Sequence, residues 1–151
     1  MIAYRIGSPI HPLFDGAGAA ASGAARWSSK GRYIIYAAEH YATALLEKAA
    51  QLNSLKIPRT LVYVRIDLPE DVSVEELRSA ALVGWDSETK TVSQRFGDRW
   101  YDERRSLILL VPSLAAPGLE RNVLINQQHR QFEGVTASVA ERVRCHPKLL
   151  A

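Results

Sequence analysis

The sequence is poor in cysteine and has no long apolar run. Its single cysteine, Cys145, cannot form a disulfide within the chain, so the protein needs no oxidising compartment. No stretch approaches the roughly 18 consecutive apolar residues that a membrane-spanning helix needs. The N-terminal segment lacks the basic start and long apolar run of a secretory signal. We therefore expect a cytoplasmic protein that does not enter a membrane.

An extreme of charge is also missing. The net charge is +3, and 23% of the residues are charged, as is ordinary for a globular protein. A length of 151 residues suits one domain, expected over 1–151. The 19 basic residues, of which 14 are arginine, are spread along the chain, and acidic residues dilute the densest stretch at 95–105. This spread favours solvated surface over a nucleic-acid interface, while the arginines suit a small phosphate-bearing ligand.

Hydrophobic periodicity predicts a single α+β domain. An apolar stripe predicts a helix over 38–52. The other expected elements are helices at 74–80 and 89–101, a loop over 7–23, strands at 1–6, 33–36, 60–66, 106–111 and 122–125, and an edge strand within 136–145. Several strands follow one another without a crossover helix, which favours a central mixed sheet with flanking helices. We expect helix 38–52 to pack on this sheet, with strands 60–66 and 106–111 as neighbours in the core.

Signatures of common cofactor and metal sites do not hold in this chain. Residues 16–21 fit the loose dinucleotide pattern G-x-G-x-x-A, but proline and aspartate precede them instead of a buried strand. A flexible loop explains them better. There is no phosphate-binding G-x-x-x-x-G-K-[ST] motif and no zinc-binding H-E-x-x-H motif. The adjacent Cys145 and His146 have no partners at zinc-ligand spacing, so no metal site is expected.

Two polar residues lie where functional side chains are often found. Glu47 lies on helix 38–52 away from its apolar stripe, on the same face as His40 and Thr43. A solvated glutamate is the commoner explanation of that position. Ser113 follows an apolar strand at its end, a place from which functional side chains project, although a turn serine is commoner.

Other polar residues have simple structural explanations. Arg26 and Trp27 lie beside a turn rich in glycine and serine, where an arginine stacked on a tryptophan would account for them. Asn122 and Asn126 are typical of residues that brace a turn through bonds from side chain to backbone.

Taken in order, several motifs resemble the RES domain, a family named for its Arg, Glu and Ser. They are YR at 4–5, GAARWSSKG at 23–31, IIYAAE at 34–39, ATALLE at 42–47, GDRW at 97–100, LVPS at 110–113 and ERNVLINQQHRQF at 120–132. The resemblance covers nearly the whole chain. It departs at AARWS, where the family usually has GGRWN, at Gln127, where proline is usual, and at CHPKL, a loose version of the family's D-P-R-L. None of these departures removes the Arg, Tyr, Glu or Ser.

The resemblance implies a bacterial toxin whose partner is an Xre-type helix-turn-helix antitoxin. It implies a fold similar to the NAD-binding core of ADP-ribosylating toxins. It also implies an enzyme that cleaves the nicotinamide–ribose bond of NAD by hydrolysis or phosphorolysis. NAD is then a substrate, and no cofactor or metal is required. Carried onto this sequence, the catalytic residues are Arg26, Tyr36, Glu47 and Ser113, and the substrate-binding residues are Arg5, Trp27, Ser28 and Asn126.

These residues suit that chemistry. Glu47 could stabilise the oxocarbenium-like transition state of glycosidic cleavage or bind a ribose hydroxyl. Arg5 and Arg26 could bind the pyrophosphate of NAD through charge-assisted hydrogen bonds. Tyr36 offers an aromatic face or a hydroxyl to the nicotinamide, and Ser113 could bind its amide or orient Glu47.

Two other functions stay open. A protein ADP-ribosyltransferase would share the NAD site and differ in its acceptor, which the sequence does not reveal. A basic RNA-binding or ribonuclease toxin would need clustered lysine and arginine with interleaved aromatics and a histidine base, and such clusters are weak here. We therefore expect no direct contact with nucleic acid. We expect an antitoxin to cover the NAD site by inserting a C-terminal segment whose acidic side chains or chain terminus pair with the site arginines. We also expect the toxin to form a homo-oligomer.

Overall fold

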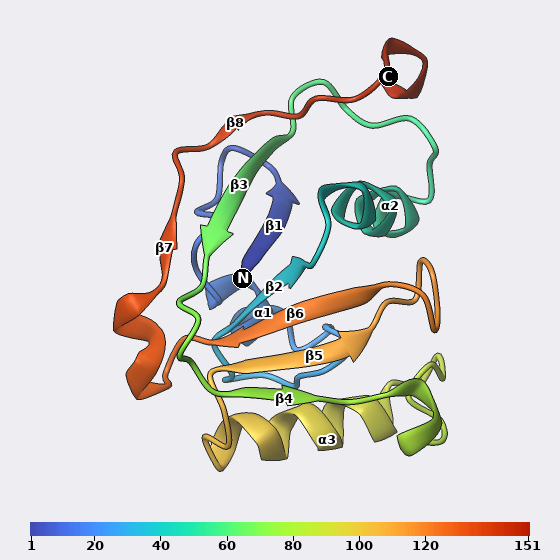
Figure 1. Cartoon of the computed structure of the whole chain (residues 1–151). Helices are drawn as coiled ribbons and strands as arrows, with labels where there is room; N and C mark the ends of the chain where they lie inside the picture. The colour runs from blue at the N-terminus through green and yellow to red at the C-terminus, as the bar shows by residue number, and fades with distance from the viewer.

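One mixed sheet of eight strands organises the computed structural model, which describes residues 1–151. The strand order is β4-β5-β6-β2-β1-β3-β7, and β8 also pairs with β3. Only β4 and β5 run parallel, and all other pairs are antiparallel. The strands are β1 (Ile2–Gly7), β2 (Ile34–Ala38), β3 (Val62–Asp67), β4 (Val74–Glu76), β5 (Ile108–Pro112), β6 (Arg121–Asn126), β7 (Thr136–Ala137) and β8 (Glu141–Arg142). This architecture, seen in Figure 1, confirms the predicted α+β class.

Three α-helices and three short 3₁₀ segments complete the chain. The α-helices are α1 (Ala17–Ser22), α2 (Tyr41–Leu52) and α3 (Thr91–Asp102), and the 3₁₀ segments are Ser79–Ala81, Arg130–Gly134 and Pro147–Leu149. None of the helices is both long enough and apolar enough to cross a bilayer. Helix α2 begins three residues later than predicted because the backbone of His40 is extended, with φ of −122° and ψ of 145°.

The register of the central strands decides which side chains share a face of the sheet. Tyr36 of β2 pairs with Leu124 of β6, and Asn122 of β6 pairs with both Ala38 and Val111. Because paired residues project to the same side, Tyr36 and Asn122 share one face.

Both long helices cover this face. Helix α2 packs through Ala44 and Ala49 against Ile6 and Ala38, which confirms that it lies on the sheet. Helix α3 packs through Trp100 and Tyr101 against Leu109 and Leu124. The predicted apolar stripe of α2 is therefore largely buried, except that Leu52 is 44% exposed.

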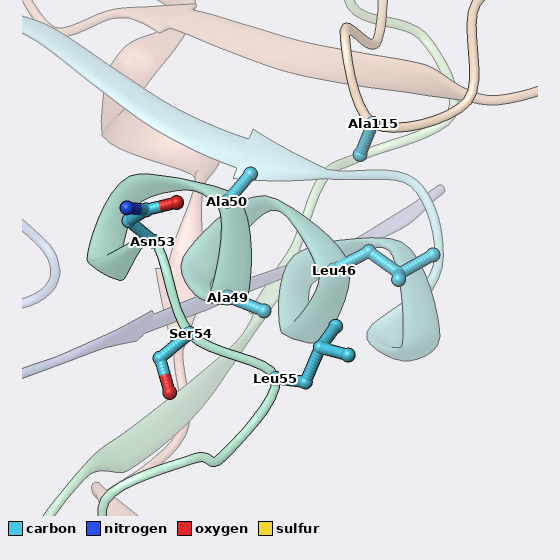
Figure 2. A pocket seen from close by; sticks show the side chains of 7 residues that line it. All are labelled: Leu46, Ala49, Ala50, Asn53, Ser54, Leu55 and Ala115. Atoms are coloured by element: carbon cyan, nitrogen blue, oxygen red, sulfur yellow. The ribbon is translucent and has the colours of Figure 1, made fainter.

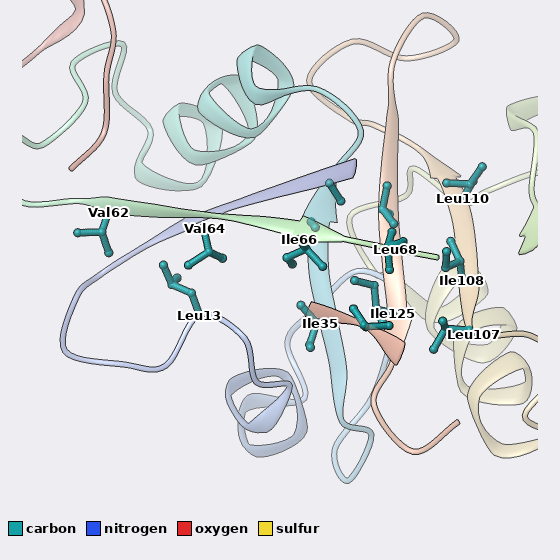
Figure 3. Packing of buried hydrophobic residues seen from close by; sticks show 14 residues of the cluster. Leu13, Ile35, Val62, Val64, Ile66, Leu68, Leu107, Ile108, Leu110 and Ile125 are labelled. Atoms are coloured by element: carbon teal, nitrogen blue, oxygen red, sulfur yellow. The ribbon is translucent and has the colours of Figure 1, made fainter. Parts of the chain in front are cut away.

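The opposite face holds the larger part of the hydrophobic core. Ile35, Ile66, Ile108 and Ile125 all have no exposed surface and pack together there, as Figure 3 shows. Neither of the two long helices, α2 and α3, covers this side. Instead the segment around Leu13 and Phe14 and the segment from Phe132 to Val135 close it.

Two predictions about local elements were wrong. Residues 74–80 form strand β4 and a 3₁₀ turn rather than a helix, because Val74–Glu76 pairs in parallel with β5. The segment 7–23 is not entirely loop, because its alanine-rich part forms α1. Gly23 ends that helix with a left-handed φ of 61°, a conformation that glycine adopts without strain.

Two predictions about strands also need correction. Strands β3 and β5, which correspond to the predicted strands 60–66 and 106–111, are not neighbours, because β6, β2 and β1 lie between them. The expected edge strand within 136–145 is two separate two-residue strands, β7 and β8, which both pair with β3. Strand order depends on pairing between distant segments, which the local pattern does not contain.

Candidate functional site

The carboxylate of Glu47 is held by two side chains from the sheet. The hydroxyl of Ser113 donates to Oε1 of Glu47 at 2.5 Å, and Nδ2 of Asn122 donates to the same oxygen at 2.9 Å. Ser113 has no exposed surface, whereas Glu47 is half-buried. Glu47 is therefore a fixed carboxylate at the edge of the interior, and the simple explanation of a solvated helix residue is wrong.

Local structure fixes Ser113 behind this carboxylate. Ser113 directly follows β5, and its amide donates to the carbonyl of Glu120 at 3.0 Å, which closes the turn into β6. Its Oγ also accepts from the amide of Ala115 at 3.1 Å. Helix α2 is tied to the same turn, because the hydroxyl of Thr43 donates to the Glu120 carboxylate at 2.7 Å. These bonds set the distance between α2 and the end of β5.

Asn122 carries the only buried side-chain nitrogen or oxygen without a hydrogen-bond partner. Its Nδ2 is used by Glu47, but its Oδ1 is inaccessible and accepts nothing within the protein. A buried acceptor without a donor costs about 1–3 kcal/mol, so such atoms are rare and often mark a binding site. The prediction that Asn122 braces a turn is wrong, because its amide holds Glu47 instead. No local signal distinguishes Asn122 from Asn126, which lies in the same apolar strand.

Tyr36 and Ser28 form a second polar pair on the same face of the sheet. Their hydroxyl oxygens are 2.7 Å apart, and Ser28 has no exposed surface. Burial raises the pKa of the Tyr36 hydroxyl far above its ordinary value, so the phenol keeps its proton. Tyr36 can therefore donate a hydrogen bond but cannot act as an anionic base near neutral pH.

Only one nitrogen of the Arg26 side chain donates hydrogen bonds to the rest of the protein. Nη1 donates to the carbonyls of Trp85 at 3.0 Å and Ser87 at 2.8 Å, while Nε and Nη2 make no hydrogen bond within the chain. Its neighbour Trp27 is 2% exposed and stacks on Trp85 with ring centroids 6.0 Å apart. Trp27 is thus part of the core, and Arg26 is anchored on the 85–87 turn with donors to spare.

The cation Arg5 acts on Lys48 of α2. Arg5 donates from Nη1 to the carbonyls of Leu13 at 2.8 Å and Asp15 at 2.7 Å. Burial and then the charge of Arg5 lower the pKa of Lys48, the residue after Glu47, which donates to Gln51 at 2.9 Å. Lys48 had no part in the sequence prediction. The contact of Arg5 with a pyrophosphate stays a prediction.

Asn126 is fully buried and satisfied by the protein. Its Nδ2 donates to the carbonyl of Tyr101 at 3.2 Å, and its Oδ1 accepts from the amide of Gln128 at 3.0 Å. These bonds are those of a turn brace at the end of β6, and both polar atoms of the Asn126 side chain have a partner within the protein.

A shallow apolar hollow of about 320 Å³ adjoins the Glu47 site. It is lined by Leu46, Ala49, Ala50, Asn53, Ser54, Leu55 and Ala115, and Figure 2 shows that these side chains come from α2, from the segment that follows it and from the loop at Ala115. Leu46 precedes Glu47, and the amide of Ala115 contacts Ser113. No group of three or more His, Cys, Asp or Glu side chains is arranged to hold a metal ion.

Comparison with known proteins gives consistent relatives. A sequence model described as the RES domain matches residues 2–147. A protein named Prs ADP-ribosylating toxin, from Sphingobium sp., is 38% identical over 140 residues, covering 90% of this chain and 86% of that protein. A protein named Toxin Res, from Pseudomonas putida, is 33% identical over 143 residues, covering 93% and 94%.

A solved structure shares the fold. The M. tuberculosis MbcT–MbcA toxin–antitoxin complex contains a chain that matches with a TM-score of 0.72, at 18% sequence identity. The match covers 94% of this chain and 83% of that one.

Proposed function

Because the chain belongs to the RES domain family, we propose that it is the toxin of a bacterial toxin–antitoxin pair and that it breaks the nicotinamide–ribose bond of NAD. The observation that carries this proposal is the Glu47 carboxylate, fixed by Ser113 and Asn122 with one oxygen left free of protein donors. Relatives of similar length named as toxins, one of them as ADP-ribosylating, support it.

The fixed carboxylate suits cleavage of an N-glycosidic bond. As the bond from the ribose anomeric carbon to the pyridinium nitrogen breaks, the bonding pair goes to the nitrogen and nicotinamide leaves as a neutral molecule. Positive charge develops on the ribose, and the negative charge of Glu47 stabilises it. Water or phosphate then adds to the anomeric carbon, and water loses a proton. Because Ser113 and Asn122 already orient the carboxylate, little reorganisation is required during the reaction.

Arg26 and Tyr36 would serve the ends of the substrate. The unused Nε and Nη2 of Arg26 can donate to a phosphate oxygen of NAD, while its Nη1 keeps the guanidinium anchored. The protonated Tyr36 can donate to, or stack against, the nicotinamide. Both roles are proposals that rest on the unused donors of Arg26 and on the protonated hydroxyl of Tyr36.

Transfer of ADP-ribose to a protein is the second candidate. It uses the same bond cleavage and the same carboxylate, with a protein side chain in place of water. The observation that favours it is the 38% identical relative named as an ADP-ribosylating toxin.

A toxin that consumes NAD must be inhibited in the cytoplasm of its own cell. We propose an Xre-type antitoxin that covers the Glu47 site. The shared fold with a chain solved as part of a toxin–antitoxin complex supports such a partner. A carboxylate-bearing segment from the antitoxin would find donors at Arg26.

Incubation of the purified protein with NAD tests the proposal. Nicotinamide release is followed by chromatography in buffers with and without phosphate, and isotope-labelled NAD is supplied together with candidate protein acceptors. Free ADP-ribose indicates hydrolysis, a phosphorylated ADP-ribose indicates phosphorolysis, and labelled protein indicates transfer. Absence of nicotinamide release in every arm would contradict the proposal.

A further inference from the structure

The amide of Asn122 has two ends, and the protein uses only one of them. We propose that Oδ1 of Asn122 accepts a hydrogen bond from a ribose hydroxyl of the substrate while Nδ2 holds Glu47. This inference rests on the proposed function and deepens it, because it assigns Asn122 to recognition of the sugar. The observation behind it is the buried and unpartnered Oδ1, beside a carboxylate that is itself fixed.

The orientation of this amide follows from its partner. Glu47 offers only acceptors when ionised, so the nitrogen of the Asn122 amide must face it. The reversed amide would place Oδ1 against Oε1 of Glu47, with two acceptors in contact and Nδ2 without the bond it now makes. Oδ1 therefore points away from Glu47 and needs a donor from elsewhere.

The neighbouring strands do not supply that donor. Asn122 pairs with Ala38 of β2 and Val111 of β5, whose side chains are apolar and almost completely buried. Ser113 could donate, but its hydroxyl proton is directed to Glu47 at 2.5 Å. No donor of the chain reaches Oδ1, and because Oδ1 has no accessible surface, the proposed contact requires the side chains that cover it to move when a ligand binds.

The chemistry of that molecule follows from a second free acceptor. Both protein donors bind Oε1 of Glu47, so Oε2 accepts no hydrogen bond within the chain. Oε2 of Glu47 and Oδ1 of Asn122 are thus two acceptors without protein donors, on side chains that one hydrogen bond joins. A ribose matches this pair, because its anomeric carbon becomes positive during cleavage and the neighbouring carbon carries a hydroxyl donor. Oε2 of Glu47 would face the anomeric carbon, and Oδ1 of Asn122 would accept a hydrogen bond from the hydroxyl on the neighbouring carbon.

A double-mutant cycle between the protein and the substrate tests this inference. Asn122→Ala and the wild type are assayed for nicotinamide release from NAD and from the analogue whose nicotinamide ribose lacks the 2′-hydroxyl. We expect Asn122→Ala to lower kcat/KM for NAD about 30-fold or more, and for the deoxy analogue by a factor at least about tenfold smaller. Ser113→Ala is the matched control, because it removes the other bond to Glu47 and leaves Oδ1 intact. Its loss should be the same on both substrates.

Asn122→Asp separates the two ends of the amide. It keeps an acceptor oxygen but removes the donor to Glu47, so turnover should fall while the preference for the hydroxylated substrate persists. In the absence of substrate, Asn122→Ala should unfold close to the wild-type temperature, because loss of the bond to Glu47 is offset by removal of an unsatisfied buried acceptor. A residue with a purely structural role would instead lower the unfolding temperature.

Equal losses of Asn122→Ala on both substrates would overturn the inference, because Asn122 would then act only through Glu47. A further arm keeps this result distinct from failure of the proposed function. If the wild type releases no nicotinamide, that function fails, and calorimetric titration with ADP-ribose still decides on Asn122. Weaker binding of ADP-ribose by Asn122→Ala than by the wild type supports the contact. Equal binding by the two proteins overturns it.

Discussion

The hydroxyl of Ser113 donates to Oε1 of Glu47 at 2.5 Å, although 66 positions separate the two residues in the sequence. Ser113 lies at the end of a core strand, and Glu47 lies on the helix that covers the neighbouring strands. The bond therefore joins two elements that the fold places independently. The orientation of the Glu47 carboxylate therefore depends on how α2 packs relative to the end of β5.

Replacement of Ser113 by alanine should lower kcat while the protein stays folded. Glu47 would keep its bond to Asn122 but lose the shorter one, so we expect kcat for nicotinamide release to fall about 10- to 100-fold. The amide of Ala115 would also lose its acceptor, at about 1 kcal/mol of unfolding free energy. Ser106→Ala is the matched control, because Ser106 is also buried and accepts from Trp100 at 2.8 Å in the core. An equal loss of kcat in both variants would contradict a specific role for Ser113.

Arg26→Lys should impair substrate binding more than the chemical step. A lysine carries all its donors on one nitrogen, so it cannot replace both Nη1, which binds the Trp85 and Ser87 carbonyls, and the separate donors Nε and Nη2. We expect KM for NAD to rise about tenfold or more with a smaller change in kcat, measured by steady-state nicotinamide release. A variant with unchanged KM and a much lower kcat would show that Arg26 acts on the reacting centre instead.

The elements that position the site could largely be predicted from sequence, whereas their arrangement could not. Helix α2 and strand β5 have patterns that local periodicity identifies, and both were found within three residues of the expected ends. The local pattern of residues 74–80 predicts a helix, but Val74–Glu76 forms a strand because pairing with β5 overrides that weak local preference. For the same reason β3 and β5 were expected together but lie apart.

Gly97 should tolerate no side chain. A methyl group at this position of α3 would overlap the carbonyl oxygen of Trp27, a backbone atom that cannot move without displacing the Arg26 segment. We expect Gly97→Ala to lower the unfolding free energy by about 3 kcal/mol or more, measured by urea denaturation. Gly18→Ala in α1 is the control, because nothing lies within 4 Å of its added Cβ. It should be neutral or stabilising by up to about 1 kcal/mol. Similar losses in both variants would refute the close contact.

The stability that His40 contributes at the start of α2 should depend on pH. The hydrogen bond and charge of Glu120 raise the pKa of His40 above 6.5, so its contribution is complete below that pH and is lost as pH rises through the raised value. The hydrogen bonds from Thr43 and His40 lower the pKa of Glu120 below 4.5, so its contribution is complete above that pH and is lost on acidification. Their combined effect is therefore largest between pH 4.5 and 6.5.

Thermal unfolding of the wild type and of His40→Gln across the pH range checks this. The difference in Tm should be greatest near the middle of that interval and should shrink above neutral pH. A difference that grows as the pH rises would have the wrong sign for a protonated His40 paired with Glu120.

The candidate site shows a similar division between what sequence can and cannot reveal. Glu47 and Ser113 were identified through motifs, but periodicity alone indicated a solvated glutamate, because its two donors are remote in the chain. Asn122 was interpreted as a turn brace because its partner lies 75 positions away. Asn126, which resembles it in sequence, does brace a turn. The two asparagines differ in their strand neighbours: Asn122 lies opposite Ala38 and Val111, whereas Asn126 lies opposite Ile34.

Nicotinamide release by Glu47→Gln tests the central claim most directly. Glutamine keeps an oxygen acceptor and the shape of the side chain but removes the negative charge. Preorganised charge at a reacting centre contributes about 3–4 kcal/mol, so turnover should fall about a hundredfold or more. Glu39→Gln is the control, because Glu39 is a carboxylate that pairs with Arg121 and makes no bond to Ser113 or Asn122, and it should keep wild-type turnover. Expression in cells should likewise deplete NAD with Glu39→Gln and not with Glu47→Gln. Wild-type turnover and NAD depletion by Glu47→Gln would contradict the proposed mechanism.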